Sequence, residues 1–394
     1  IARVVAICHD SDLALLEVEG PDFMEDVEPA EIGDLPELQD RVSVLGYPVG
    51  GEELSVTEGV VSRMEVQTYS HSQRRLLAGT VDAAINDGNS GGPVVKDGKV
   101  VGIAFQSLDD AENIGEMVPT PVIEHFLGCV AAGRAPILPA IGVGWQGMQN
   151  PELRRAHNLK AGQAGVLVTS VAYGSTGYGL VQVGDVLHSI GGHPIANNGT
   201  VQYRNRFRVA WYGLLCEYQV GDPMELEWSR AGVVQRSQVP LQPPTHLVQP
   251  HNYDRKPTYF VYGGIVFQPL TLEYLREWNN WWEKAPRELV QIYYRGVRSE
   301  ACQEVVVLSM VLGDRVNVGY DGISDERVVS VGGVAPRDMA HFVQLVESTQ
   351  GLLTLKTSSG LSIVLDTELA REAGPRILGR YRVPRDRSED LARR

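Results

Sequence analysis

The first third of the chain alternates short apolar stretches with polar turns. Strands about every ten residues, with little helix between them, are typical of a β-barrel domain. The Asp97-Gly98 pair supplies the positive-φ turn of a hairpin, the polar stretch 68–75 indicates an exposed loop, and a short helix is expected at 122–130. The expected strands cover residues 2–8, 12–18, 41–48, 55–62 and 94–103.

A glycine-rich run between two of these strands carries the clearest chemistry. Ser90 lies at a tight turn between Gly88 and Gly91-Gly92, within the run Ala83–Pro93. Glycine can adopt backbone angles that aim the amides of Gly88 and Ser90 at one point, which would form an oxyanion hole. A glycine-rich hairpin with an incidental serine is the alternative. The length of the motif, D-A-A-I-N-x-G-N-S-G-G-P, favours Ser90 as a nucleophile.

Asp12 begins the second apolar strand and allows two interpretations. A turn aspartate usually caps local amides. The downstream serine motif favours a second role, in which Asp12 orients a catalytic histidine.

Composition restricts the remaining classes. The 394 residues suggest two to three domains, 43% apolar residues are enough for a core in each, and a net charge of −14 argues against a nucleic-acid partner. No apolar run is long enough to span a membrane, and no signal peptide opens the chain. We expect free thiols at the four dispersed cysteines, and neither a metal nor a cofactor site. These cysteines are Cys8, Cys129, Cys216 and Cys302.

Two later stretches resemble PDZ domains, the second more weakly. The first shows a strand at 165–171 followed by Val183–Leu187 and a Gly191-Gly192 hairpin. Its x-Φ-G-Φ segment, Ala140, Ile141, Gly142 and Val143, would offer amides to the carboxylate of a peptide C-terminus. A groove covered by a neighbouring domain is the alternative. In the second stretch, a helix bearing Trp278, Trp281 and Trp282 is expected to pack a core or a subunit contact.

Several motifs together resemble the HtrA/Deg serine proteases, specifically the plant-type branch with two PDZ domains. They are Asp12–Leu15, Gly46–Gly50, Gly59–Ser62, Asp82–Pro93, Gly102–Gln106 and Glu112–Gly115. The resemblance implies a mainly β fold: a trypsin-like double β-barrel, incomplete at its N-terminus, followed by two PDZ-like α+β domains. It also implies that Ser90 is the nucleophile, that Asp12 is the triad acid and that Ile85 lines the S1 pocket. An apolar pocket wall predicts cleavage after small or medium aliphatic residues.

The family also has a catalytic histidine in a T-N-x-H context upstream of the acid. No such histidine precedes Asp12 in this sequence, and His9 and His71 are interpreted as surface residues. Because Ile1 already lies in a strand, an upstream segment carrying the histidine is expected, and the chain alone should be inactive. Family members form trimers or multiples of trimers. The loops at 68–79, 86–89 and 106–115 resemble those that switch the site.

The resulting hypothesis is an ATP-independent serine endopeptidase of unfolded polypeptides that forms homo-oligomers. The rival is an inactive protease-fold scaffold or chaperone that binds peptides through its PDZ domains. Chloroplast, nucleus and bacterial periplasm are the candidate locations. The expected domains are a protease domain at 1–134, PDZ domains at 135–243 and 256–371, and a C-terminal tail at 372–394, which is expected to be charged and mobile from Pro384 onward.

Overall fold

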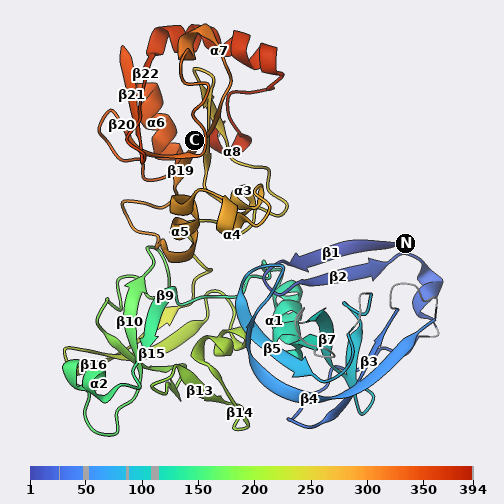
Figure 1. Cartoon of the computed structure of the whole chain (residues 1–394). Coiled ribbons are helices and arrows are strands. Elements are labelled where there is room, and N and C mark those ends of the chain that lie inside the picture. Colours follow the sequence, from blue (N-terminus) through green and yellow to red (C-terminus); the bar gives the residue numbers. More distant parts are fainter. Residues whose placement is uncertain (26, 48–52, 86–87, 108–114, 393–394) are drawn as a thin grey trace. The chain divides into compact units, whose positions relative to one another are not determined.

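The computed structural model describes the chain except residues 26, 48–52, 86–87, 108–114 and 393–394. It divides into two compact units, residues 1–244 and 245–394 (Figure 1). The expected end of the third strand, the loop between Ile85 and Gly88, and most of the loop at 106–115 fall on the undescribed residues.

A closed six-stranded barrel forms the centre of the first unit. Its strands follow the order β3-β4-β5-β8-β7-β6, each antiparallel to its neighbours. The alternation of apolar and polar residues determines which side chains enter the barrel core. In β3, Val42 and Val44 are buried in the core, and Ser43 between them is only partly buried. The strands are β3 (Arg41–Gly46), β4 (Ser55–Thr68), β5 (Arg75–Val81), β6 (Pro93–Lys96), β7 (Lys99–Ser107) and β8 (Gly115–Pro119).

The N-terminal residues form a separate two-stranded sheet, β1 (Ala2–Cys8) and β2 (Leu13–Val18). A short 3₁₀ turn, η1 (Pro21–Met24), follows it. Asp97 and Gly98, at φ 50° and 78°, make the expected hairpin turn between β6 and β7. The expected helix is also present, as α1 (Thr120–Ala131).

A second sheet follows in the same unit, in the order β16-β15-β11-β10-β9, with β12 paired to β11. Strand β9 is therefore an edge strand. The elements are β9 (Val143–Gly147), α2 (Pro151–Ala156), β10 (Val166–Val171), β11 (Val186–Ile190), β12 (His193–Pro194), β13 (Thr200–Tyr203), β14 (Phe207–Ala210), η2 (Trp211–Glu217), β15 (Pro223–Arg230) and β16 (Val233–Pro240).

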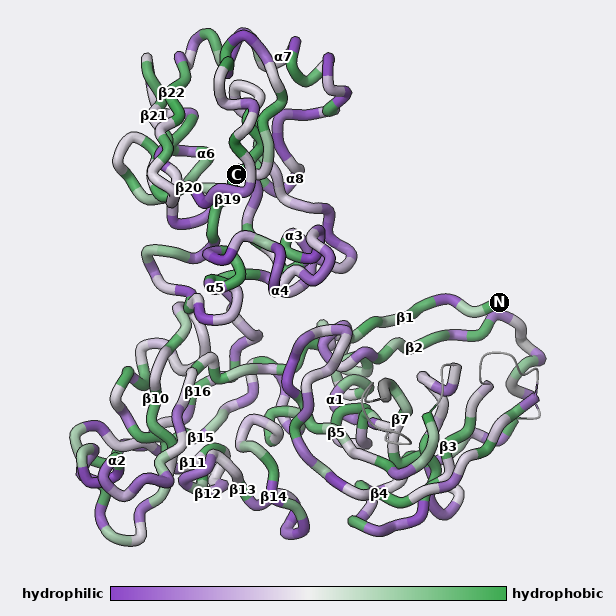
Figure 2. The backbone as a smooth tube through the Cα atoms, viewed as in Figure 1, coloured by the Kyte–Doolittle hydropathy of each residue, from purple (hydrophilic) through white to green (hydrophobic). Residues whose placement is uncertain are grey.

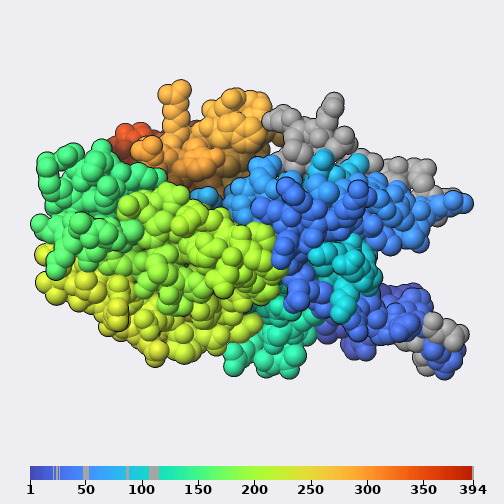
Figure 3. Space-filling view, turned by 90° about the horizontal axis from the view of Figure 1, so that it is seen from below, coloured from blue at the N-terminus to red at the C-terminus, as the bar shows by residue number. Residues whose placement is uncertain are grey.

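The barrel and this second sheet share one hydrophobic core. The contact is made by η2, where a methyl group on Gly213 would lie 2.7 Å from the Val66 side chain, and Trp211 is buried beside it. Figure 3 shows the yellow-green surface of this segment lying directly against the blue surface of the barrel. The barrel and the second sheet therefore form one body.

The second unit is a six-stranded sheet in chain order, β17 to β22, covered by helices. One core surrounds Phe342 and a second surrounds Leu275 and Leu289. In Figure 2, green apolar stretches follow strands in both units, for example at β10. The elements are β17 (Phe260–Tyr262), β18 (Ile265–Pro269), α3 (Leu272–Arg276), α4 (Trp281–Lys284), α5 (Arg287–Arg295), β19 (Val306–Val311), η3 (Arg315–Asn317), β20 (Glu326–Val331), α6 (Met339–Ser348), β21 (Leu352–Thr357), β22 (Ser362–Asp366), α7 (Thr367–Tyr381) and α8 (Glu389–Ala392).

The structure differs from the expectations for two C-terminal segments. The three tryptophans do not share a helix, because α3 ends before Trp278 and Asn280, at φ 56°, precedes α4. The charged tail is not detached either. The amide of Val261 donates to Asp386 O at 2.7 Å, and Arg387 pairs with Glu347 at 2.6 Å.

Candidate active site

Ser90 lies in a four-residue turn between β5 and β6. The amide of Gly92 donates to Asn89 O at 2.9 Å, and Gly91 takes φ 88° at the third position, as a type II turn requires. The amide of Gly91 donates to Ala104 O of β7 at 2.6 Å. This turn leaves Ser90 exposed to solvent.

The turn is packed tightly against β3. A methyl group on Gly92 would lie 2.0 Å from Leu45 O, and one on Gly46 would lie 2.6 Å from Asn89 Oδ1. Asn89 itself is buried, with 1% of its surface exposed. The glycines are therefore required by space, and the position of Ser90 is fixed by the barrel wall.

The amides of Gly88 and Ser90 are the candidate donors of the oxyanion hole. Gly88 takes φ 98°. Neither the Gly88 amide nor the Ser90 amide donates a hydrogen bond to any residue that the structure describes. Unused amides at an exposed turn have the chemistry needed to stabilise an oxyanion.

Asp12 lies in the turn between β1 and β2, at φ 56°, with its side chain exposed. Positive φ is tolerated by aspartate more readily than by most residues. Within the described part of the chain, no hydrogen bond joins the Ser90 hydroxyl to Asp12 or to a histidine. The structure therefore does not assemble a triad from the residues it describes.

The structure brings together His9 and His71, which were interpreted from the sequence as surface residues with no mutual contact expected. His9 Nδ1 lies 3.2 Å from His71 Nε2, and the two rings stack with their centroids 5.5 Å apart. Only this long-range contact between the β1–β2 turn and the loop after β4 reveals the pair, so no local sequence signal could have found it.

Ile85 precedes the serine turn in the chain and is buried, with 8% of its surface exposed. Its side chain packs on the backbone of Gly115 at the start of β8, where an added methyl group would lie 2.2 Å from Ile85 Cδ1. Glycine at 115 thus makes room for the isoleucine, which gives this part of the barrel an apolar lining.

The segment Ala140–Val143 leads into the edge strand β9. Two of its carbonyls accept hydrogen bonds from the following part of the chain: Gly177 N donates to Ile141 O and Ala172 N donates to Gly142 O, each at 2.9 Å. The amides of Ile141 and Gly142 donate to no described residue. Ile141 is buried, with 1% of its surface exposed, whereas Gly142 is partly exposed, so the Gly142 amide is the one that a carboxylate can reach.

The strand edges beside such a loop differ between the units. Beyond β9, the Trp145 ring packs on Gly199, where an added methyl group would lie 2.2 Å from Trp145 Cη2, and Met148 N donates to Asn197 O. In the second unit β18 is paired on both edges, with β17 and with β19. Strand β18 therefore offers no free edge to an incoming peptide strand, whereas β9 lies at the edge of its sheet.

Three of the cysteines are buried, and burial controls their chemistry. Burial raises the pKa of the Cys8 thiol to about 11 and that of Cys216 to about 12. Cys129 also has a raised pKa, again chiefly through burial. These thiols stay protonated at neutral pH, which makes them poor nucleophiles.

Cys129 belongs to a polar cluster where α1 meets the segment after η2. Cys129 Sγ donates to Gln219 Oε1 at 2.5 Å, and Gln219 Nε2 lies 3.3 Å from His125 Nδ1. Burial lowers the pKa of His125, and the nearby carboxylates of Asp10 and Asp222 oppose this only in part. His125 is therefore neutral in the fold.

This burial predicts a pH-dependent stability. The lowered pKa of His125 means that the unfolded chain binds a proton more readily than the folded one, so stability should fall as the pH drops below the ordinary value of 6.5. In thermal unfolding followed by circular dichroism, the midpoint should drop by a few degrees more between pH 7.5 and 5.5 in the wild type than in His125→Gln. Equal drops in both proteins would contradict the assignment.

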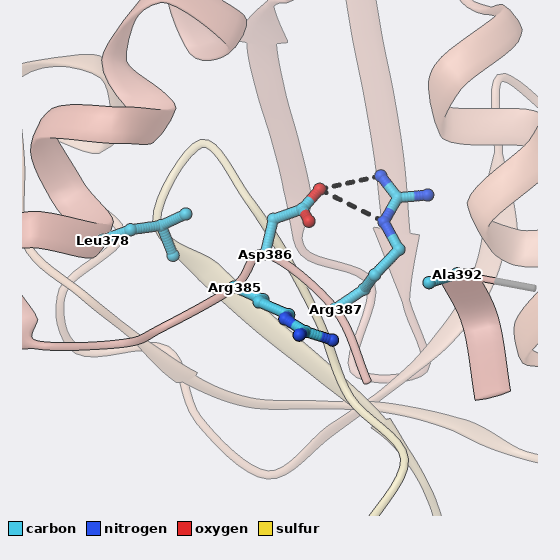
Figure 4. Close-up of a pocket in the computed structure, with 5 residues that line it drawn as sticks. All are labelled: Leu378, Arg385, Asp386, Arg387 and Ala392. Atoms are coloured by element: carbon cyan, nitrogen blue, oxygen red, sulfur yellow. Dashed lines mark hydrogen bonds and ion pairs between the residues drawn. The ribbon is translucent and has the colours of Figure 1, made fainter. Parts of the chain in front are cut away.

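An open pocket of about 540 Å³ in the second unit carries no comparable chemistry (Figure 4). Figure 4 shows Asp386 turned toward Arg387, with which it pairs at 2.7 Å. Arg385 lies 3.6 Å from Glu389. Both arginines are thus already compensated. The lining residues are Leu378, Arg385, Asp386, Arg387 and Ala392.

Among the described residues, no cluster of three or more histidine, cysteine, aspartate or glutamate side chains could hold a metal ion. None of the helices in the described ranges combines the length and apolar character needed to cross a membrane.

Comparison with known families defines the class of protein. Residues 1–103 match the trypsin-like peptidase domain and residues 248–390 match the PDZ domain. The fold is thus that of a trypsin-like peptidase joined to a PDZ domain. Of the two PDZ-like domains expected from the sequence, the family match covers the second.

Curated relatives then define the family. The chain is 37% identical over 396 residues to "Protease Do-like 2, chloroplastic" of Arabidopsis thaliana, an alignment that covers 99% of this chain and 65% of that protein. It is 35% identical over 392 residues to "Putative protease Do-like 3, mitochondrial" of the same plant, covering 99% and 68%. It is 36% identical over 393 residues to "Putative protease Do-like 13", also from Arabidopsis thaliana, covering 99% and 76%.

The chain therefore belongs to the HtrA/Deg family of serine proteases, and the resemblance seen in its motifs is confirmed. It spans about two thirds of the length of the first two relatives. A solved HtrA-type protease, AlgW with a decapeptide, aligns with 62% of this chain and 72% of its own at 24% identity and a TM-score of 0.46.

Proposed function

We propose that the protein is a serine endopeptidase that cleaves unfolded polypeptides, with Ser90 as its nucleophile. The observation that carries the proposal is the serine turn: an exposed hydroxyl, a glycine frame fixed against β3, and two amides that donate to no described residue.

The reaction follows from these groups. Ser90 Oγ attacks the scissile carbonyl carbon while its proton passes to a histidine, which the family pattern places upstream of Asp12. Asp12 holds that imidazole in the required tautomer, and the amides of Gly88 and Ser90 donate to the oxyanion. The tetrahedral intermediate then breaks its C–N bond, and the protonated histidine returns the proton to the leaving amine. Water hydrolyses the acyl-enzyme by the same steps.

Digestion of casein by the full-length protein tests this directly. The wild type should degrade casein without ATP, and Ser90→Ala should not. If both proteins digest casein alike, Ser90 is not the nucleophile and the proposal fails. If neither digests it, the inactive scaffold that binds peptides becomes the better description.

We further propose that the segment Ala140–Val143 receives the C-terminal carboxylate of a peptide. The undonated amide of Gly142, and the position of β9 at the sheet edge, support this. Assembly into homo-oligomers, trimers or multiples of them, belongs to the same proposal and rests on the family.

Ile85 should set the preference for the residue on the acyl side of the cleaved bond. Removing its side chain in Ile85→Ala opens space above Gly115, so bulkier residues should be accepted there. A pocket change of this size shifts relative kcat/KM by about 10- to 100-fold. Cleavage rates on peptides with valine or phenylalanine at that position measure the shift. Ile32→Ala, at a position with 43% of its surface exposed, is the control and should leave the ratio unchanged. An unaltered ratio in Ile85→Ala would remove Ile85 from the pocket.

A further inference from the structure

Three segments that are distant in sequence contact one another close to Asp12. They are the turn between β1 and β2, which carries Asp12, the loop between β4 and β5, and the connector at 136–139 that leads into β9. Asp10 Oδ2 accepts hydrogen bonds from Arg74 Nη1 at 2.9 Å and from Leu138 N at 3.0 Å. Arg74 Nη2 donates to Leu138 O at 3.2 Å and lies 3.5 Å from Pro139 O.

We infer that Asp10 and Arg74 are positioning residues that fix the orientation of Asp12 for the reaction. The inference rests on the proposed function, because it gives Asp12 the role of triad acid. Beyond the proposed function, it assigns a role to two further residues, which act on Asp12 through the backbone of the turn.

The pair is built to hold its position. The side chains of Arg74 and Asp10 are only 13% and 20% exposed, and Leu138 is buried. Charge-assisted hydrogen bonds in such surroundings are stronger than exposed ones, and removing one partner leaves the other charge uncompensated. It would also leave the buried Leu138 amide without its acceptor.

Neighbouring bonds anchor the turn on both sides of the pair. Ser72 Oγ donates to Asp10 O at 2.8 Å, and it accepts from Arg74 N at 3.1 Å. Cys8 Sγ donates to Pro136 O at 2.8 Å. The strand end at Cys8 and the turn at Asp10 are thus both tied to other segments.

Asp12 itself contributes nothing to this anchoring. Its side chain is exposed, its φ is 56°, and its carboxylate makes no hydrogen bond with any described residue. The anchors at Asp10 and Cys8 therefore fix the backbone from which the Asp12 carboxylate projects. A catalytic group displaced by about 1 Å can cost about 100-fold in rate.

The test uses the full-length protein and a fluorogenic peptide substrate. Asp10→Asn and Arg74→Met should lower kcat by about 10- to 100-fold with KM changed less than about twofold, because the group they displace acts in the chemical step. Arg74→Lys keeps the charge but loses the fork to Leu138 and Pro139, and should give an intermediate kcat. Glu65→Gln, which breaks the exposed 3.3 Å pair with Arg63, is the control and should keep the wild-type kcat.

Double variants that combine these substitutions with Asp12→Asn separate a positioning role from a merely structural one. In Asp12→Asn, the additional effect of Arg74→Lys or Asp10→Asn on kcat should shrink to less than about twofold, because residues that act through a common group are not additive. The folded fraction of each variant, measured by circular dichroism below its unfolding midpoint, corrects kcat for misfolded protein.

Three results would overturn the inference. Unchanged kcat in Asp10→Asn and Arg74→Met, with only the thermal midpoint lowered, would make the pair structural. Fully additive losses in the Asp12→Asn background would show that the pair acts elsewhere. Activity equal in the wild type and Ser90→Ala would reject the proposed function and the inference together, whereas the first two results leave the protease proposal intact.

Discussion

Ser90→Ala should lower kcat for peptide hydrolysis by the full-length protein by about 10⁴- to 10⁶-fold. Loss of the nucleophilic serine removes the covalent route, and what remains comes from binding and the oxyanion hole, as in other triad proteases. The measurement is the initial rate on a fluorogenic peptide at saturating substrate. Labelling by a fluorophosphonate should disappear in the same variant, because the reagent forms its bond with an activated serine oxygen.

The fold should survive this substitution. The Ser90 side chain is exposed and its hydroxyl makes no hydrogen bond with the described residues, so the thermal midpoint should stay within about 1 °C of wild type, as for most surface changes. Ser62→Ala offers a matched control, since its hydroxyl donates to Thr80 O at 3.2 Å away from the serine turn. Wild-type hydrolysis in Ser90→Ala, or lost hydrolysis in Ser62→Ala, would disprove the assignment of the nucleophile.

Local features of the site could be predicted from sequence. The Asp97-Gly98 hairpin and the glycine frame of Ser90 depend on backbone angles that only certain residues adopt, so a few adjacent letters suffice. Gly59 is likewise required by space, because an added methyl group would lie 1.9 Å from Asp82 O.

Features that depend on long-range contacts could not be predicted. The polar loop at 68–75 was expected to be exposed, yet Tyr69 is fully buried and donates its hydroxyl to Leu77 O at 2.6 Å. The Asp10–Arg74 pair joins residues 64 positions apart, and Asp10 meets the Leu138 amide 128 positions away. Composition and periodicity carry no signal for such pairings.

Tertiary packing also overrode periodicity at the tryptophans. Their spacing fits one helix, but Trp281 stacks on Tyr294 of α5 at 5.6 Å, while Trp278 meets Tyr274 near α3. Each ring follows a different partner, and the left-handed Asn280 between them ends the helical path. Similarly, the charged tail is ordered by partners in the sheet, since Arg387 lies over the Phe260 ring at 5.0 Å.

Gly92→Ala should destabilise the first unit by about 2–4 kcal/mol and reduce kcat by about 100-fold. Its φ is outside the left-handed region, so alanine is conformationally acceptable there, and space alone decides the outcome. The added methyl group would lie 2.0 Å from Leu45 O and 2.9 Å from Asn89 O, both backbone atoms that cannot rotate away. The turn must therefore move off β3 and carry Ser90 with it. Denaturant unfolding and peptide hydrolysis measure the two effects.

The adjacent glycine separates space from backbone conformation. Gly91 takes φ 88° but has no atom within 4 Å of the position of an added methyl group. Gly91→Ala should therefore cost only the left-handed strain, about 1–2 kcal/mol, and less kcat than Gly92→Ala because nothing pushes the turn away from β3. If Gly91→Ala proved the more damaging of the two, conformation and not contact with Leu45 would fix the serine turn. The larger loss at Gly92 would instead identify β3 as the wall against which the nucleophile is held.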